Sequence, residues 1–372
     1  MDLSGEDALR LNVLLANKPQ AIRIDESTLT LYALFERGES KLTLNPNCRE
    51  ELYLRRVREL LSGHVLGSPG GYPIYLKRWN RMGQARDENL EQLLLLGEPE
   101  AVVAITSARG LTDELARRAW WTCQEPDNAR RMLENQCIQK GRMGPELARF
   151  LIEYLPFETE PMTIVESLRL ALQPGLVSDE VRVSLWKRCA RKPTYYLGFL
   201  SSIPDDLPQL PPARPMSDVT LAALQQLSES GNPFATQLLR CCSSRGQGFL
   251  KICLRVMEKP ANQDVVVMLL DVLRDYFSSL RPDGVADLTL EQLQKETQSL
   301  QSECFMACCD IARQYEKEFR ALYLLSGLGY GVVRPVFSKT DSIGSLMRKK
   351  LVPIFNPMKE QMGLLLYSNA KE

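Results

Sequence analysis

The stretch from Gly97 to Ile203 constrains the fold most, because helix-start signals recur in it at nearly regular intervals. Each signal is a proline just inside a helix or a small or capping residue just before one. The predicted starts lie near Glu98, Thr112, Pro126, Gly144, Pro161 and Ser178. They are roughly 14–18 residues apart, so alternate helices repeat at roughly 28–35 residues. This period predicts a HEAT-like array of stacked helix hairpins.

Apolar residues within these predicted helices recur at i, i+3 and i+4. Leu147 and Leu151 form one such stripe, and Ile164 and Leu168 form another. A helix with a single apolar stripe buries only one side, so its stability must come from neighbouring helices. The fold class that follows is mainly α.

The first part of the chain has a different periodicity. A short amphipathic helix is predicted over 6–17, and apolar and polar residues then alternate in three runs around Ile22, Leu31 and Leu42. Period-two alternation between turn-forming residues predicts a three-stranded antiparallel meander. Such a sheet needs a cover for its apolar face, and the amphipathic segment after Pro46 can supply it. We therefore expect a small α+β domain at the N-terminus.

Composition shifts divide the chain into five predicted segments. The clearest boundary is a run of five prolines, which favour extended backbone. A single long helix is expected from Thr289 to about Ser326, and the glycines and prolines that follow predict an irregular end. The segments are an α+β domain (1–86), a helical-repeat array (87–203), a proline-rich linker (204–216), a second helical segment (217–330) and an irregular C-terminal tail (331–372).

Charge and hydropathy limit the classes of partner. The 46 basic residues balance the 46 acidic ones, so overall charge does not attract the chain to nucleic acid or to an anionic membrane. The longest gently apolar run, 321–333, is too short for a bilayer about 30 Å thick. Ten cysteines without an export signal indicate reduced thiols, and we expect a cytoplasmic protein without a membrane span.

Motifs of catalysis are not apparent in the sequence. Its single histidine, His64, excludes a multi-histidine metal site and has no Ser or Cys nucleophile signature nearby. The glycines near it are not followed by the Gly-Lys-Ser/Thr of a phosphate loop. We therefore predict a non-catalytic protein without a cofactor, metal or catalytic residue.

A cysteine cluster is the first candidate site. Cys304 and Cys308 are spaced to share a helix face, and Cys309 follows directly. Such thiols could carry sulfur or sense redox state. Cys304 and Cys308 also continue an apolar stripe of the predicted long helix, where free cysteine acts as a small hydrophobic residue. The stripe favours a structural role and leaves the thiol site as the alternative.

A basic segment is the second candidate site. Between Arg49 and Arg86 stand eight basic residues against three acidic ones, with aromatic residues interspersed. Guanidinium groups can hold phosphates while aromatic rings stack on bases. The alternative is the solvated face of a helix that covers a small sheet. The candidate contact residues are Arg55, Arg58, Lys77, Arg78, Trp79 and Arg81.

The running sequence resembles a known family. LNVLLAN at 11–17, the stretch 53–103 that begins YLRRVRELL, and LTDELARRAWW at 111–121 are similar to the DsrS proteins. These are encoded with the reverse-acting dissimilatory sulfite reductase system of sulfur-oxidising bacteria. The resemblance extends from the N-terminus to about Pro208 and includes no catalytic signature. It implies a cytoplasmic accessory or regulatory role in sulfur oxidation.

Two functions of different classes follow. The favoured one is a helical scaffold that binds a protein partner, or RNA through the basic segment. The alternative is a thiol-based sulfur carrier or redox sensor that uses the cysteine cluster. The sequence leaves the oligomeric state open.

Overall fold

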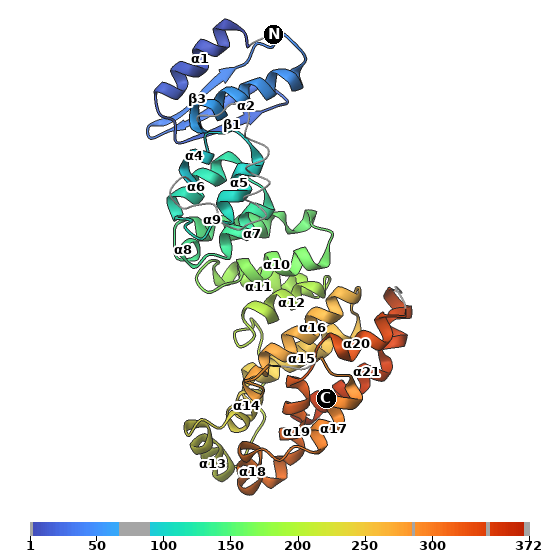
Figure 1. Cartoon of the computed structure of the whole chain (residues 1–372). Helices are drawn as coiled ribbons and strands as arrows, with labels where there is room; N and C mark the ends of the chain where they lie inside the picture. Colours follow the sequence, from blue (N-terminus) through green and yellow to red (C-terminus); the bar gives the residue numbers. More distant parts are fainter. Residues whose placement is uncertain (1–2, 67–89, 285–286, 340–342, 368–372) are drawn as a thin grey trace. The chain divides into compact units, whose positions relative to one another are not determined.

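The computed structural model describes residues 3–66, 90–284, 287–339 and 343–367. This part of the chain is mainly helical and has one small antiparallel sheet near the N-terminus, which confirms the predicted fold class (Figure 1). The HEAT-like regularity remains a prediction. The chain divides into two compact units, Met1–Tyr154 and Leu155–Glu372. This division falls inside the predicted array 87–203 and not at the proline-rich segment.

The predicted meander is present in the first unit. Its strands are β1 (Ala21–Asp25), β2 (Thr30–Phe35) and β3 (Gly38–Thr43). The three strands pair antiparallel in the order β1-β2-β3, and Arg23, Tyr32 and Lys41 lie opposite one another across them. The hairpin between β2 and β3 is tight because Gly38 adopts a φ of 139°, which other residues rarely accept.

Two helices cover one face of the sheet. They are α1 (Gly5–Ala16) and α2 (Glu50–Leu66). Their apolar stripes form a core with the inward side chains of the strands, including Leu31 and Leu42. Asp7 of α1 is fully buried, and its carboxylate accepts hydrogen bonds from the Tyr53 hydroxyl at 2.5 Å and the Asn45 amide at 2.7 Å. These bonds tie α1 to α2 and to the segment before it.

Short helices follow in the described part of the first unit. They are α4 (Leu90–Leu93), α5 (Pro99–Thr106), α6 (Asp113–Thr122), α7 (Pro126–Leu133), α8 (Gln136–Gln139) and α9 (Met143–Tyr154). Four of them begin within one residue of a predicted start. The cause is local, because Thr112 accepts the Leu115 amide and prolines occupy the first positions of α5 and α7.

Helices also make up the described part of the second unit. Its α-helices are α10 (Pro161–Ala171), α11 (Asp179–Cys189), α12 (Thr194–Ser202), α13 (Asp218–Glu229), α14 (Pro233–Cys242), α15 (Ser244–Glu258), α16 (Gln263–Tyr276), α17 (Leu290–Gln298), α18 (Glu303–Ile311), α19 (Glu316–Ser326), α20 (Tyr330–Phe337) and α21 (Gly344–Leu365). The 3-10 helices are η2 (Leu155–Phe157), η3 (Ser278–Leu280) and η4 (Arg313–Tyr315). The starts of α10 and α11 match the predictions at Pro161 and Ser178, whereas the start of α12 was not predicted.

The proline-rich segment 204–216 contains neither helix nor strand, but it is packed into the second unit and is not a free linker. Leu207 is 3% exposed. The guanidinium of Arg214 donates to the Leu364 carbonyl at 2.6 Å and to Glu318 at 2.7 Å. Prolines remove backbone donors without preventing such side-chain contacts.

Two expectations for the C-terminal third were wrong. The predicted single helix from Thr289 to Ser326 is divided into α17, α18 and α19, because Ser302 caps a new helix by accepting the Phe305 amide. The predicted irregular tail, 331–372, contains most of α20 and all of α21. The helix α21 runs through Pro353 and Pro357, the residues that predicted irregular structure.

Candidate functional site

A polar hollow of about 440 Å³ in the first unit gathers ionisable side chains from separate segments. It lies between the end of β1, the middle of α2, the start of α5 and the loop after α6. Its lining residues are Arg23, Ile24, Asp25, Glu26, Tyr32, Arg58, Gly97, Glu98, Pro99, Thr122, Cys123, Gln124 and Glu125. Because it is open and polar, it suits a small polar group of a ligand or partner.

Arg58 connects two carboxylates in this hollow. Its guanidinium lies 2.5 Å from Glu26 and 2.9 Å from Glu98. Burial raises the pKa of Glu98 to about 7, although the charge of Arg58 works in the opposite direction. Glu98 is therefore divided between its charged and neutral forms near neutral pH, which is a common property of functional sites.

Arg23 is held between two aromatic rings. Its guanidinium carbon lies 4.7 Å from the centre of the Tyr32 ring and 5.1 Å from that of Trp121. The Trp121 indole N–H is fixed in turn by donating to Glu39 at 3.1 Å. The Nε of Arg23 is buried and has no hydrogen-bond partner among the described residues. The rings favour the cation without neutralising it, because their attraction is that of a quadrupole.

The hollow supports binding better than bond chemistry. Glu98 could accept a proton, but the nearby Cys123 is a poor nucleophile because burial, and then the charge of Glu125, raises the pKa of its thiol. No sequence motif joins Arg58 and Glu98, which lie 40 positions apart, so the site was not predicted. A usable signal was the acidic residue directly before Pro99, where a capping side chain is more common.

The candidate thiols are not equivalent. Cys304 is exposed, whereas Cys308 and Cys309 are buried. Burial raises the pKa of the Cys308 thiol to about 12, and its sulfur lies 3.3 Å from the Asn232 side-chain oxygen. Burial, followed by the charge of Glu316, also raises the pKa of Cys309. The expected continuous stripe through Cys304 is wrong, because α18 starts anew at Glu303 and leaves Cys304 in its exposed first turn.

The basic segment is only partly described. Arg55 is exposed and bonds to Glu59 on its own helix at 3.2 Å, and Arg58 belongs to the hollow. The other candidates, Lys77, Arg78, Trp79 and Arg81, lie outside the described residues. His64 is exposed in the last turn of α2.

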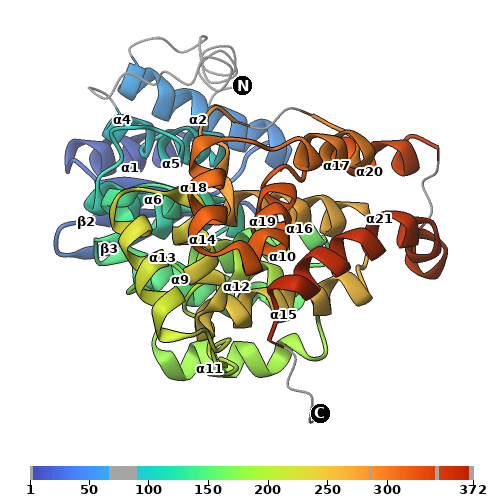
Figure 2. The ribbon, with the colours of Figure 1, turned by 90° about the horizontal axis from the view of Figure 1, so that it is seen from below.

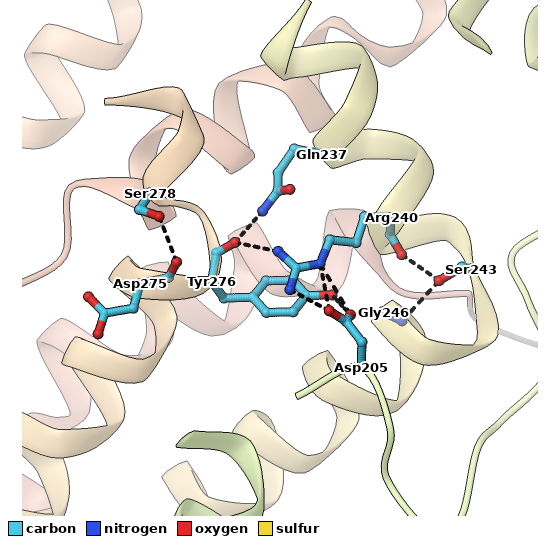
Figure 3. A network of polar contacts seen from close by, with 8 residues as sticks. All are labelled: Asp205, Gln237, Arg240, Ser243, Gly246, Asp275, Tyr276 and Ser278. Atoms are coloured by element: carbon cyan, nitrogen blue, oxygen red, sulfur yellow. Dashed lines mark hydrogen bonds and ion pairs between the residues drawn. The ribbon is translucent and has the colours of Figure 1, made fainter. Parts of the chain in front are cut away.

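A second polar network connects the proline-rich segment, through Asp205, to Arg240 and Tyr276 on helices of the second unit (Figure 3). The Arg240 guanidinium stacks 3.6 Å from the centre of the Tyr276 ring. The same guanidinium donates to Asp205 at 3.1 Å and to the Tyr276 carbonyl at 2.9 Å. The Tyr276 hydroxyl donates to Asp205 at 3.0 Å, and its ring stacks on Phe249 from the other side.

The effect of this network is structural. Burial alone would lower the pKa of Arg240, but its hydrogen bonds to Asp205 keep the pKa above the usual value. Burial raises the pKa of Tyr276 well above its usual range, so the hydroxyl stays protonated. The network therefore binds parts of the chain to one another. Within the described ranges, no group of three or more His, Cys, Asp or Glu side chains could hold a metal ion.

Comparison with protein-family models, curated proteins and solved structures finds no match to this chain. The chain is therefore classified by its fold, a mainly helical protein with a small antiparallel sheet near its N-terminus. In the part that the structure describes, no helix has both the length and the apolar character needed to cross a membrane.

Proposed function

We propose that this chain is a non-catalytic accessory protein of bacterial sulfur oxidation, a cytoplasmic helical scaffold that binds a protein partner. The sulfur pathway enters through the resemblance of its running sequence to the DsrS proteins. The structural observation that carries the protein-binding role is the exposed outer face of α21. The polar networks described above hold the protein together and offer little to a reaction.

The helix α21 is amphipathic in an unusual way (red, Figure 1). Its buried stripe includes Met347, Leu351 and Met358, each no more than 1% exposed. The exposed side of its first half carries Leu346 and Val352, which are 54% and 47% exposed, together with the exposed Lys349 and Lys350. Exposed large apolar side chains beside basic residues are common at interaction surfaces.

Charge on the same face indicates the chemistry of the partner. The exposed Lys349 lies between Leu346 and Val352 in the sequence, within the basic cluster 348–350. A partner surface with apolar side chains and carboxylates would complement this face. A protein supplies both, whereas RNA supplies phosphates and little aliphatic surface. In the described part of the N-terminal basic segment, Arg55 and Arg58 already pair with carboxylates, which also favours a protein.

The alternative, a thiol-based sulfur carrier or redox sensor, has less support. A sulfur carrier needs an accessible thiolate. Cys308 and Cys309 are buried with raised pKa values, and only Cys304 of the cluster is exposed.

Affinity capture tests the proposal. Full-length tagged protein would be incubated with extract of cells growing on reduced sulfur, beside a variant carrying Leu346→Asp and Lys349→Glu. We expect a sulfur-oxidation protein to be enriched by the wild type and lost from the variant. Lys187→Glu, an exposed charge reversal on α11, serves as the matched control and should retain the partner.

Three outcomes would count against the proposal. If the double variant captures the partner as well as the wild type does, the α21 face is not the binding site. If ribonuclease treatment abolishes capture, the partner is bound through RNA. If the specific partner is unrelated to sulfur oxidation, the scaffold function stands and the assignment to the sulfur pathway is wrong.

A further inference from the structure

Among the described residues, no strand pairs with the outer edge of β3, and we propose that this edge pairs with the β3 edge of a second copy of this chain. At the opposite margin of the sheet, β1 is already covered, because the Ile22 amide donates to the Leu94 carbonyl at 2.8 Å. No strand lies beyond β3 among the described residues. The hairpin of β2 and β3 projects at one side of the first unit in both views (Figures 1 and 2).

The register of the sheet shows which main-chain groups of β3 point outward. The Leu44 amide donates to the Leu29 carbonyl at 2.8 Å, so every second residue back along β3 also faces β2. The backbone groups of Glu39 and Lys41 therefore point away from the sheet. Both residues are exposed. An exposed edge of this kind is a template for another strand.

The charges on this edge select one antiparallel register. With a two-fold axis at Ser40, Glu39 of each copy lies opposite Lys41 of the other, which gives two charge pairs. Both are outward-facing residues, so the backbone bonds and the charge pairs form together. Moving the axis to Lys41 or to Glu39 puts like charges opposite each other, which is unfavourable. Lysine on an edge usually prevents pairing; here Glu39 makes the edge complementary to itself.

An apolar groove beside the edge supports the same pairing. The groove, about 710 Å³, lies between α1 and β3, and its lining includes Phe35 and Leu42. On its α1 side, Leu9 is 66% and Val13 is 55% exposed. Because α1 lies on one face of the sheet, the two-fold axis at Ser40 brings both grooves to the same face of a continuous six-stranded sheet. Leu9 and Val13 of the two copies then face each other and lose contact with water.

Sedimentation of the full-length protein over a concentration series tests this proposal. We expect reversible dimers of the wild type. Lys41→Glu and Glu39→Lys each place like charges opposite each other, so each should weaken the dimer at least about tenfold. An equimolar mixture of the two variants restores both charge pairs and should associate as tightly as the wild type.

Lys251→Glu on α15 is the matched control, because it reverses an exposed charge far along the chain. Leu9→Asp tests the groove separately and should also weaken the dimer without altering the strands. Thermal unfolding of each variant identifies any loss of fold. A wild type that stays monomeric, a dimer unaffected by Lys41→Glu, or a mixture that fails to restore association would each overturn the proposal.

Discussion

Arginines held by a carboxylate and a tyrosine ring recur in the second unit. They are Arg240 with Asp205 and Tyr276, Arg281 with Glu296 and Tyr323, and Arg214 with Glu318 and Tyr315. The planar guanidinium can bond along its edge and stack on its face at the same time, which lysine cannot do. In two of the three groups, the tyrosine hydroxyl also donates to the carboxylate, at 3.0 Å from Tyr276 and 2.8 Å from Tyr323. This arrangement attaches irregular segments and helix ends to the helical core.

Removal of Arg240 should destabilise the second unit. The change Arg240→Ala leaves Asp205 without its partner and uncovers one face of the Tyr276 ring, and we expect a loss of about 2 kcal/mol in the free energy of unfolding. Urea unfolding followed by circular dichroism measures this loss. Arg245→Ala, at an exposed position on α15, should stay within about 0.5 kcal/mol of the wild type. Equal effects of the two variants would contradict the structural role of the network.

The raised pKa of Glu98 predicts a pH dependence of stability. Its pKa is about 7 in the folded protein against a usual 4.5, so the folded state holds an extra proton between these values. Stability from this group therefore falls as pH rises from about 4.5 to 7 and then levels off. Glu98→Gln, which mimics the neutral form, should gain about 2–3 kcal/mol on the wild type across that range.

Urea unfolding of both proteins at pH 4.5 to 8.5 measures this difference. Glu51→Gln on the exposed side of α2 is the control and should follow the wild type at every pH. A constant gap between Glu98→Gln and the wild type would show that Glu98 titrates normally.

At the scale of elements, α21 shows how burial outweighs a local signal. Proline inside a helix costs about 3 kcal/mol, and this helix contains two. Its buried stripe consists of Met347, Leu351, Ile354, Phe355, Met358, Met362 and Leu365. Burial of each such side chain contributes about 1.5–3 kcal/mol, so the stripe exceeds the cost of the prolines. The two prolines are a strong local signal for irregular structure. They carry no information about α15, α19 and α20, the neighbours against which α21 packs.

The three thiols of α18 should differ in reactivity because they differ in exposure. Its first turn exposes Cys304, whereas its body buries Cys308 and Cys309. In the native protein, a thiol reagent should therefore modify Cys304 readily, and the other two should react only after denaturation. Mass spectrometry of labelled peptides at timed intervals distinguishes the three. Rapid native labelling of Cys308 would instead favour the thiol-based function.

At the scale of the whole chain, two units divide the described structure between Tyr154 and Leu155. Each unit has buried apolar side chains of its own, such as Tyr53 in the first and Phe249 in the second. We therefore expect 1–154 and 155–372, expressed separately, each to unfold cooperatively on heating. A break at 203, the boundary that the prolines predicted, should fail, because it would separate Arg182 from Asp206 and α12 from α15 and α16, on which it packs. Circular dichroism and calorimetry of the four fragments would show which division is correct.

The sequence alone determined the elements whose causes are local. Prolines, Thr112 and the alternation around Ile22 and Leu31 act within a turn or a hairpin, so the meander and most helix starts of the array were predictable. Only the tertiary structure decided which side chains are buried and which charges meet. Arg58 meets Glu98, and Cys308 is buried while Cys304 is not, because segments distant in the sequence supply the surroundings. Burial and pairing depend on neighbours in space, and local periodicity does not specify them.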